Sequence, residues 1–548
     1  MEYIYWYKDA VFYEVYVRAF ADGNGDGHGD FLGLTAKLDY FVELGVTCLW
    51  LLPMYPSPLK DDGYDISDYC NIHPDYGTLE DFKTFLAEAH GRGLRVIADL
   101  VLNHTSDQHL WFRSARASKD SLYRDYYVWS DTDRKFKEAR IIFLDTEKSN
   151  WAWDDKTGQY YWHRFYSSQP DLNFDNPYVR AEMLNVIKFW LDLGLDGFRV
   201  DAVPYLFERD GTNCENLPET HEYLKEIRRF VDKHYPGRIL LAEANQWPQD
   251  LRPYFGEGDE FHLAFNFPFM PRIFMALATA DRSPLTEIMR AMPTIPDNCQ
   301  WCTFLRNHDE LTLEMVSPTE RDFMWRVYAP QRRMSLNLGI RRRLAPLLGG
   351  DRRKIELAHS ILLTLPSSPI LYYGDEIGMG DNLELEDRDG LRTPMQWTAN
   401  INAGFSSTDS AELYTPVIED DHYSYERVNF VAQQGDAASL WHTLRQMITL
   451  RKQHQVFGRG TFEFLPIRNR AVLAFARIYE REVIFAIHNL SSRPQRIRPR
   501  LHRWQRSGVH DLLAQRMVAS IGDKPYTLTL QPYEYRWLKL TPTPPAEE

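Results

Sequence analysis

Short apolar runs separated by amphipathic stretches recur along most of this chain, and they constrain its fold more than any other feature. Helical patterns lie between the runs, for example at Leu79–His90 and at Pro177–Leu193, which is opened by the cap residue Asn176. Repeated strand–helix units indicate parallel strands, and eight such units predict a (β/α)8 TIM barrel. The eight predicted strands are Val11–Phe20, Thr47–Leu52, Arg95–Leu100, Gly197–Val200, Ile239–Ala242, Phe261–Phe267, Trp301–Leu305 and Ile370–Tyr373.

Three connections are too long for a simple barrel. The segment 104–173 after the third strand predicts an inserted domain, so the barrel occupies 1–103 and 174–456. Two further insertions are expected after strands seven and eight, at about 310–368 and 380–440, and the first contains helical stretches near Thr319–Ser335 and Lys354–Leu365. Loops of this size usually cover functional sites.

The pattern changes near residue 457 to short alternating runs, which predict a C-terminal β-sandwich over 457–548. Examples are Ala471–Arg477, Val483–His488 and Tyr533–Leu540. The tail Thr541–Glu548 is expected to be disordered.

The charge balance argues against polyanions as main partners. The chain carries 63 Lys and Arg against 77 Asp and Glu, a net charge of −14, so we expect neither nucleic acid nor an anionic membrane as a partner. A basic run, Arg341–Arg343 with Arg352–Lys354, is interpreted as a solvated helix face paired with nearby acids. No apolar run reaches the roughly 18 residues of a membrane span.

Cysteine usage indicates a reducing compartment. Five cysteines are an odd number for a disulfide framework, and Cys299 and Cys302 lie in an apolar segment that predicts a buried thiol pair rather than a zinc or redox site. The stretch Met1–Asp9 has neither a basic nor an apolar signal-peptide region. We therefore expect a cytoplasmic protein, and the sequence leaves open whether it forms a homo-oligomer.

Polar residues cluster where four of the predicted strands end. In a parallel barrel, the carboxyl ends of the strands face the active site. One acid alone could simply cap the next helix, but four such ends in one barrel predict a catalytic site. These ends are Ala98–His104, Gly197–Val203, Leu241–Asn245 and Arg306–Glu310.

Two carboxyl groups on adjacent strands suit glycoside cleavage. Asp201 and Glu243 follow the fourth and fifth strands, so a separation near the roughly 5 Å of retaining enzymes is expected. Arg199 lies two residues before Asp201 and points to the same face, where its charge would keep Asp201 ionised. Glu243 follows the apolar Leu240–Ala242, a setting that raises the pKa toward that of an acid.

The four strand ends resemble the four signature regions of glycoside hydrolase family 13, the α-amylase family, and the resemblance covers essentially the whole chain. It implies Asp201 as nucleophile, Glu243 as general acid/base and Asp309 as the third carboxylate, which binds sugar hydroxyls and strains the ring. One departure is Ala242, where the family usually has glycine before the glutamate. The glutamate and its strand context remain.

The same resemblance implies how a glucose ring is held. His104, Arg199 and His308 correspond to residues of the −1 subsite, where the cleaved glucose lies. The stretch after strand two resembles a family loop in which Asp61 closes the non-reducing end and Tyr64 stacks on the ring. A closed end implies exo-acting or disaccharide chemistry. Two further positions implied to bind substrate are Gln169 and, on the acceptor side, Arg392.

Within the family, five stretches resemble members that interconvert maltose and trehalose: 6–11, 243–248, 307–312, 339–347 and 388–397. The implied function is an isomerase of a small disaccharide, working by intramolecular α-glucosyl transfer through a covalent glucosyl-aspartate, with minor hydrolysis to glucose. The nearest alternative is an oligo-1,6-glucosidase or α-glucosidase that hydrolyses short α-glucosides. A catalytically dead barrel used as a binding subunit is disfavoured, because all three carboxylates are present.

Two structural calcium sites are expected. The stretch Asp22–Asp30 alternates oxygen ligands with glycines, as calcium loops do, although a metal-free Gly/Asp turn is the alternative. Its ligands would be Asp22, Asn24, Asp26 and Asp30, with the His28 carbonyl. The family resemblance implies a second ion between the barrel and the inserted domain, where the alternative is ordinary hydrogen bonding. Its ligands would be Asn103, Asp171 and Glu208, with the carbonyls of Tyr205 and Leu206.

Overall fold

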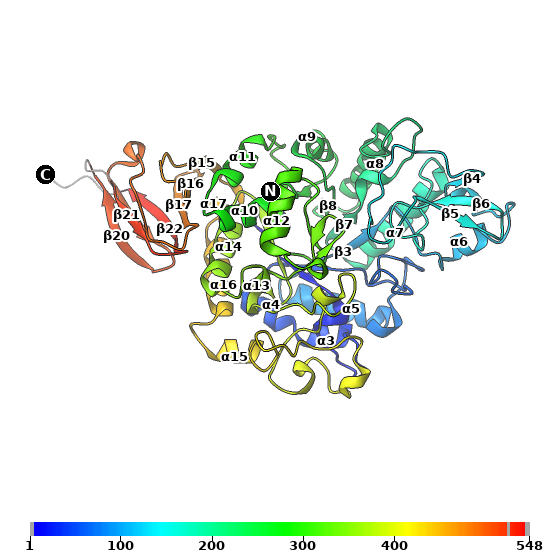
Figure 1. The fold of residues 1–548 in the computed structure, drawn as a ribbon, viewed down its shortest axis with the longest axis horizontal. Coiled ribbons are helices and arrows are strands. Elements are labelled where there is room, and N and C mark those ends of the chain that lie inside the picture. Colours follow the sequence, from blue (N-terminus) through cyan, green and yellow to red (C-terminus); the bar gives the residue numbers. More distant parts are fainter. Residues whose placement is uncertain (1–4, 523–525, 543–548) are drawn as a thin grey trace.

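The computed structural model describes residues 5–522 and 526–542, and eight parallel strands form its centre. They close into a barrel in the order β1-β14-β10-β9-β8-β7-β3-β2 (Figure 1), so the predicted TIM barrel is confirmed. Each strand falls on a predicted run: β1 (Phe12–Val15), β2 (Cys48–Leu51), β3 (Arg95–Val101), β7 (Gly197–Asp201), β8 (Ile239–Ala242), β9 (Leu263–Phe265), β10 (Gln300–Phe304) and β14 (Ser368–Tyr372).

The first strand is shorter than predicted. β1 ends at Val15, and the rest of the predicted strand forms the helical turn α2 (Val17–Phe20). Phe20 there stacks on Phe41 with ring centroids 5.0 Å apart, which places an apolar side chain against the barrel without a strand. An apolar run alone does not separate a buried strand from a buried helical turn.

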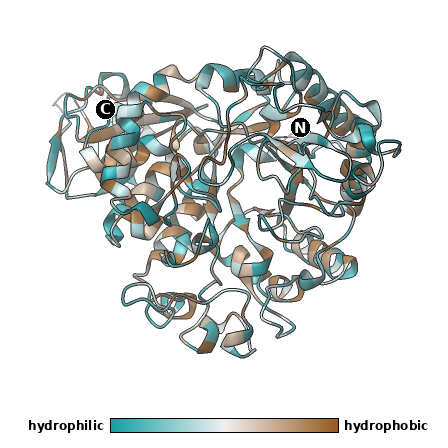
Figure 2. Ribbon diagram, turned by 45° about the vertical axis from the view of Figure 1, so that its right-hand side comes forward, coloured by the Kyte–Doolittle hydropathy of each residue, from teal (hydrophilic) through white to brown (hydrophobic). Residues whose placement is uncertain are grey.

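The helices around the barrel begin and end where the sequence signals predict. In α7 (Pro177–Leu193), the Asn176 side chain accepts a hydrogen bond from the Tyr178 amide, and the helix ends at Gly194, whose φ of 112° suits glycine. In α5 (Leu79–Gly91), Thr78 and Asp81 form a capping box. Figure 2 shows hydrophobic and hydrophilic residues alternating along such outer helices, as expected when one face packs on the strands.

The segment 104–173 forms a small antiparallel sheet beside the barrel. Its strands β4 (Trp129–Ser130), β5 (Trp151–Asp154) and β6 (Gln159–Trp162) have the order β4-β6-β5. Bridge pairing between His104 and Asp171 joins the two ends of the segment at the barrel. Figure 1 shows this inserted domain at the right-hand end of the molecule.

The first insertion ends earlier than predicted. It contains β11 (Leu311–Thr312), α12 (Pro318–Tyr328), β12 (Ser335–Leu336) and β13 (Gly339–Ile340). The next long helix, α14 (Arg352–Thr364), packs against α16 (Leu440–Gln453) and precedes β14. It is therefore the helix of the seventh strand–helix unit, and we use "lid" for residues 309–351 only. The second insertion, 380–440, contains mostly short turns and α15 (Phe430–Gly435).

The interpretation of Arg341–Arg343 as a solvated helix face is wrong. These residues lie between β13 and α13 (Leu344–Leu347), and Arg343 is fully buried and donates to the Tyr373 carbonyl. Arg341 donates to the Leu385 and Asp387 carbonyls of the second insertion. The basic run therefore joins the two insertions, a contact between distant segments that local charge spacing does not reveal.

The chain ends in the predicted β-sandwich, at the left in Figure 1. Six strands have the order β15 (Thr461–Phe464), β16 (Val472–Tyr479), β17 (Glu482–Asn489), β22 (Tyr535–Pro542), β19 (Ser507–Asp511), β20 (Arg516–Ile521), and β18 (Gln495–Ile497) pairs with β21 (Leu528–Leu530). The tail expected to be disordered lies outside the described residues from 543 onward, whereas 541 and 542 belong to β22. Within 5–522 and 526–542, no helix is long and apolar enough to cross a membrane.

Candidate active site

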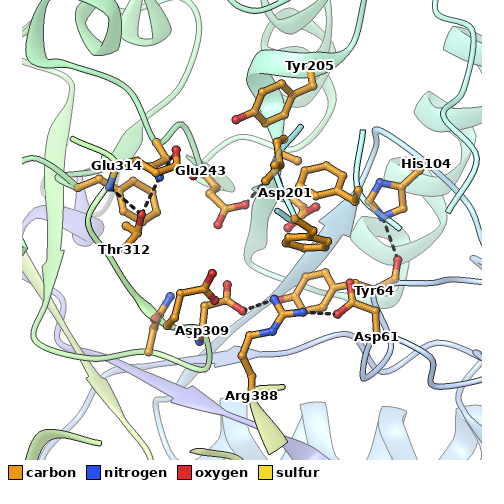
Figure 3. A pocket seen from close by; sticks show the side chains of 18 residues that line it. Asp61, Tyr64, His104, Asp201, Tyr205, Glu243, Asp309, Thr312, Glu314 and Arg388 are labelled. Carbon is orange, nitrogen blue, oxygen red and sulfur yellow. Dashed lines mark hydrogen bonds and ion pairs between the residues drawn. The ribbon is translucent and has the colours of Figure 1, made fainter. Parts of the chain in front are cut away.

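A pocket opens at the carboxyl end of the barrel, where the sequence places its polar strand ends. It contains about 850 Å³ of empty space, including the open solvent at its mouth. Figure 3 shows the Asp201, Glu243 and Asp309 side chains pointing into it. The structure thus brings the three predicted carboxylates together, from the ends of β7, β8 and β10.

Arg199 lies beneath the pocket and binds two of these acids, Asp201 and Glu243, together with Asp99. Strand β7 pairs with β3 so that Arg199 is level with Asp99, and the Arg199 Nη1 lies 2.8 Å from Asp99 Oδ1 and 2.7 Å from Asp201 Oδ1. Its Nη2 lies 2.6 Å from Glu243 Oε1. The guanidinium is fully buried, so a fixed cation holds the catalytic pair in place.

A backbone turn after β7 brings Glu243 close to Asp201. Ala202 has a φ of 51°, a left-handed conformation, and its amide donates to Glu243 Oε2 at 3.0 Å. Asp201 Oδ1 and Glu243 Oε1 also bind the two terminal nitrogens of one guanidinium, that of Arg199. Two carboxyls held by one guanidinium suit the short carboxyl separation of retaining glycosidases rather than the longer one of inverting enzymes.

The two acids differ in pKa in the order that the mechanism needs. Burial, with help from Asp99 and against Arg199, raises the pKa of Asp201 to about 6. Burial also raises the pKa of Glu243 to about 7, helped by the charge of Asp201. Near neutral pH, Asp201 is therefore mostly ionised while Glu243 retains a proton for much of the time.

Asp309 is held by three cations. Its Oδ1 lies 2.9 Å from Arg388 Nη1 and 3.1 Å from Arg392 Nη2, and its Oδ2 lies 3.2 Å from His308 Nε2. Although burial raises the pKa of Asp309, His308 and Arg388 outweigh it and hold the pKa well below its usual range. Asp309 is therefore a permanent carboxylate.

Arg388 closes one end of the pocket. Its Nη2 lies 2.7 Å from Asp61 Oδ1, so Arg388 bridges Asp61 and Asp309 (Figure 3). Asp61 accepts a second hydrogen bond from Gln169 Nε2 at 2.8 Å. Asp61 and Gln169 were expected here from the sequence, whereas Arg388 was not, although it begins the 388–397 stretch that resembles the family.

Tyr64 and His104 line the same end of the pocket. The Tyr64 ring stacks on His308 with centroids 5.4 Å apart, and its hydroxyl donates to Asp99 Oδ2 at 2.9 Å. His104 Nε2 lies 3.2 Å from the Tyr64 carbonyl, and burial lowers the pKa of His104 to about 3. A neutral imidazole and a fixed aromatic ring are suitable contacts for a sugar.

Four predicted substrate residues lie behind the side chains that line the pocket: Gln169, Arg199, His308 and Arg392. Gln169 is fully buried behind Asp61. Arg392 lies behind Asp309, donates from Nε to the His308 carbonyl at 3.0 Å and binds Asp62. Gln169 and Arg392 orient residues that do line it.

The other side of the catalytic pair carries polar groups that the sequence did not single out for sugar binding. Figure 3 shows Thr312 and Glu314 across the pocket from Asp61. Asn245 Nδ2 donates to both, at 3.2 Å and 3.1 Å. Arg140 of the inserted domain lies 2.8 Å from Glu314 Oε2. Distant segments contribute these residues, so no local motif identifies them.

The second predicted calcium site fits an ion by its unpartnered oxygens. Asn103 Oδ1, Asp171 Oδ2 and Glu208 Oε1 are each buried without a hydrogen-bond partner in the described part of the chain. Burial raises the pKa of Asp171 to about 8, and burial and the charge of Asp171 raise that of Glu208. A cation among these oxygens would bind the unpartnered oxygens and offset the free-energy cost of burying the two carboxylates.

The carboxylates of the predicted Asp22–Asp30 calcium loop accept hydrogen bonds from nearby backbone amides. Asp30 accepts from the amides of Gly23, Asn24 and Gly33, and Asp22 accepts from those of Asn24, Gly25 and Gly27. In the described residues no three His, Cys, Asp or Glu side chains converge as a metal site, those of this loop included. The loop has the hydrogen bonding of a metal-free turn.

Known proteins similar to this chain share its whole architecture. Residues 14–341 and 341–460 match the family described as alpha amylase, catalytic domain, and residues 462–537 match maltogenic amylase, C-terminal domain. The chain belongs to the alpha-amylase family. This membership confirms the expectation from the four strand ends.

Within the alpha-amylase family, two relatives match this chain over nearly its full length. A trehalose synthase of Pimelobacter sp. is 55% identical, over 98% of this chain and 96% of the relative. A trehalose synthase/amylase of Mycolicibacterium smegmatis is 54% identical, over 99% and 94%. Among solved structures, a trehalulose synthase of Pseudomonas mesoacidophila superimposes with a TM-score of 0.80 at 28% identity, covering 98% of this chain and 99% of that chain.

Proposed function

We propose that this protein is an isomerase that interconverts maltose and trehalose by retaining intramolecular α-glucosyl transfer. The single observation that carries the proposal is the pocket itself: a retaining carboxyl pair lies between an end closed by Asp61 and Arg388 and a second polar half bounded by the lid. Relatives of 54–55% identity, described as a trehalose synthase and as a trehalose synthase/amylase, support the same reaction over the hydrolytic alternative.

The first half of the reaction breaks the glucosidic bond. Asp201 attacks the anomeric carbon while Glu243 gives its proton to the 4-oxygen of the leaving glucose, so a covalent glucosyl–Asp201 and a free glucose result. Asp309, itself held by His308, binds hydroxyls of the glucosyl ring, and Asp61 and Arg388 leave no space beyond that ring.

The second half uses the same groups in reverse. The freed glucose turns in the pocket and presents its anomeric hydroxyl, and Glu243 now removes that proton as the oxygen attacks the glucosyl carbon. The product is trehalose, and Asp201 is released. Attack by water instead yields glucose, so the fraction of hydrolysis depends on how well the lid excludes water.

The lid is closed against the inserted domain in this structure. Asp145 of that domain binds Arg332 Nη2 at 2.8 Å and accepts from the Asn337 amide at 2.9 Å. Arg140 joins Glu314 of the lid to Glu215 after β7. These contacts enclose the half of the pocket in which the free glucose would stay.

One incubation tests the proposal. Maltose with isotopically labelled free glucose should give mainly unlabelled trehalose with some glucose, because the transferred group and the acceptor stay together. Label entering trehalose in proportion to its concentration would show that the acceptor exchanges freely. If only glucose forms, the oligo-1,6-glucosidase or α-glucosidase function takes over, with Asp201 and Glu243 in the same roles.

We also propose a structural calcium ion among Asn103, Asp171 and Glu208, with the carbonyls of Tyr205 and Leu206. The three unpartnered oxygens support this site. An ion there would join the inserted domain to the barrel and take no part in the chemistry. An ion in the Asp22–Asp30 loop stays a prediction from spacing, which elemental analysis would test.

Five free cysteines, four of them buried, support a cytoplasmic location.

A further inference from the structure

Glu14 of strand β1 lies beneath the active site and has one charged partner there. It is fully buried, and its Oε1 accepts from the His308 backbone amide at 3.2 Å and lies 2.5 Å from His308 Nδ1. Its other oxygen, Oε2, has no hydrogen-bond partner among the described residues. In the described ranges, His308 is the residue that forms an ion pair with Glu14.

Both ring nitrogens of His308 face oxygens that need a proton from it. On one side, Nδ1 faces the Glu14 carboxylate. On the other, Nε2 lies 2.8 Å from the Tyr64 hydroxyl and 3.2 Å from Asp309 Oδ2. The Tyr64 hydroxyl donates its own proton to Asp99, so it accepts from Nε2. Neutral imidazole has one N–H, whereas this arrangement uses two.

We propose that Glu14 is a positioning residue that keeps His308 doubly protonated, so that the −1 subsite contains a fixed imidazolium donor against Asp309. This inference rests on the proposed function only for the meaning of that subsite. Glu14 does not touch the reacting atoms. It acts through His308, to which it is bound from the opposite side of the ring.

The surroundings of His308 favour the charged ring. Carboxylates approach it from β1, from its own segment and, more distantly, from β3. Two cations of other elements lie close, and each is bound to a carboxylate: Arg392 donates to the His308 carbonyl and binds Asp309, and Arg199 of β7 lies 3.5 Å from the Tyr64 hydroxyl and binds Asp99. Trp50 of β2 covers the ring edge-on at 5.8 Å. The charged and titratable groups that face His308 are Glu14, Asp309, Asp99, Tyr64, Arg392 and, through Tyr64 and Asp309, Arg199 and Arg388.

Electrostatics agree with this proton count. Burial alone lowers the pKa of His308, but Asp309 and Glu14 outweigh burial and raise it to about 9. If Glu14 lost its charge, burial would oppose one carboxylate instead of two, and the ring would become neutral at a lower pH. A neutral ring would turn a lone pair toward Glu14 or Asp309, and Asp309 would lose a partner that orients it.

The variant Glu14→Gln isolates the charge. Glutamine has nearly the same volume, and its amide oxygen can still accept from Nδ1, so the change is mainly electrostatic. Nitrogen-15 NMR of histidine-labelled protein, with the His308 signals assigned by their loss in His308→Asn, reports how many ring nitrogens carry a proton. We expect both to be protonated at pH 8 in the wild type and one in Glu14→Gln.

Kinetics provide a second readout. The KM for maltose should rise about tenfold in Glu14→Gln at pH 8, where one charged hydrogen bond is lost, and change little at pH 6. A merely structural role would raise KM equally at both pH values. The control is Glu376→Gln, another fully buried barrel carboxyl, which accepts from Tyr13 and Tyr40 and should leave the His308 titration unchanged.

Two results would overturn the proposal: a wild-type His308 with one bare ring nitrogen at pH 7, or a Glu14→Gln protein whose His308 titrates as in the wild type. The wild-type spectrum alone decides the first, even if the variant does not fold. Neither measurement needs turnover, so a protein that makes no trehalose would contradict the proposed function without affecting this result.

Discussion

At the scale of single residues, the catalytic pair works because one environment gives two carboxyls different pKa values. Asp201 and Glu243 both touch Arg199, yet Glu243 has the higher pKa of the two, about 7 against about 6. From the sequence, the charge of Arg199 was expected to keep Asp201 ionised. Arg199 does lower that pKa, but burial is the larger effect and leaves the value above normal.

Replacing either catalytic carboxyl should nearly abolish turnover, and the two variants should differ in whether they still form the covalent intermediate. Asp201→Asn and Glu243→Gln should each lose about a thousandfold in rate with maltose, since each removes a covalent or proton-transfer step. With an α-glucosyl fluoride, whose leaving group needs little protonation, Glu243→Gln should still form the covalent intermediate and Asp201→Asn should not. Mass spectrometry of the protein detects that intermediate, and melting curves confirm folding. Normal turnover by a folded Asp201→Asn protein would end this mechanism.

The pH profile should follow from the same pair. The first step needs Asp201 ionised and Glu243 protonated, so kcat/KM should fall below about pH 6 and above about pH 7. Asp99 raises the pKa of Asp201 through its charge. Asp99→Asn should therefore move the acid limb to lower pH, and rates between pH 4 and 9 measure this. An acid limb that stays in place or moves upward would contradict the assignment.

At the scale of elements, the sequence predicted what is local and missed what distant segments assemble. Eight strands and four polar strand ends could be found because strand runs and the residues after them are contiguous, as at Gly197–Asp201. The arginine partners of Asp309 and Glu314 could not be found in this way. Arg388 lies in the second insertion and Arg140 lies in the inserted domain, both far from their partners in the sequence. The lid boundary was misplaced because α14 has the same helical pattern whether it covers the pocket or the barrel.

Loosening the lid should favour hydrolysis. Asp145→Ala removes two side-chain contacts between the inserted domain and the lid, to Arg332 and to the Asn337 amide. We expect the ratio of glucose to trehalose to rise by up to about fivefold, because a largely exposed ion pair contributes roughly 0.2–1 kcal/mol. Chromatography of maltose incubations measures the ratio. The exposed Asp120 of the same domain, changed to Ala, is the control, and an equal rise there would remove the lid explanation.

At the scale of the whole molecule, one junction determines how the inserted domain is held on the barrel. Asn103 follows β3, Asp171 ends the inserted domain and Glu208 follows β7. Without an ion, the Asp171 and Glu208 carboxyls are buried close to each other, and burial raises both pKa values. The folded state must then take up protons that the unfolded chain has released. Below about pH 4 both carboxyls are protonated in the folded and the unfolded protein, so they do not reduce the free energy of unfolding. As the pH rises toward about 8, they lower the free energy of unfolding of the metal-free protein progressively.

Glu208→Gln should consequently change stability in opposite directions with and without calcium. In excess chelator, the variant should melt a few degrees above the wild type, since a neutral amide needs no proton uptake and does not repel Asp171. With calcium in excess, the wild type gains stability by mass action, about 2.7 kcal/mol at a hundred times Kd, and the variant, which lacks a ligand, should melt below it. Melting curves at pH 7 measure both conditions, with the exposed Glu222→Gln on α8 (Pro218–His234) as control.

Chelation should lower the melting temperature of the wild type but have little effect on activity measured at once afterwards, because no step of glucosyl transfer uses the ion. If chelator leaves the wild-type melting temperature unchanged and elemental analysis finds no metal, the calcium site is wrong. The three oxygens would then be buried without a partner at this junction.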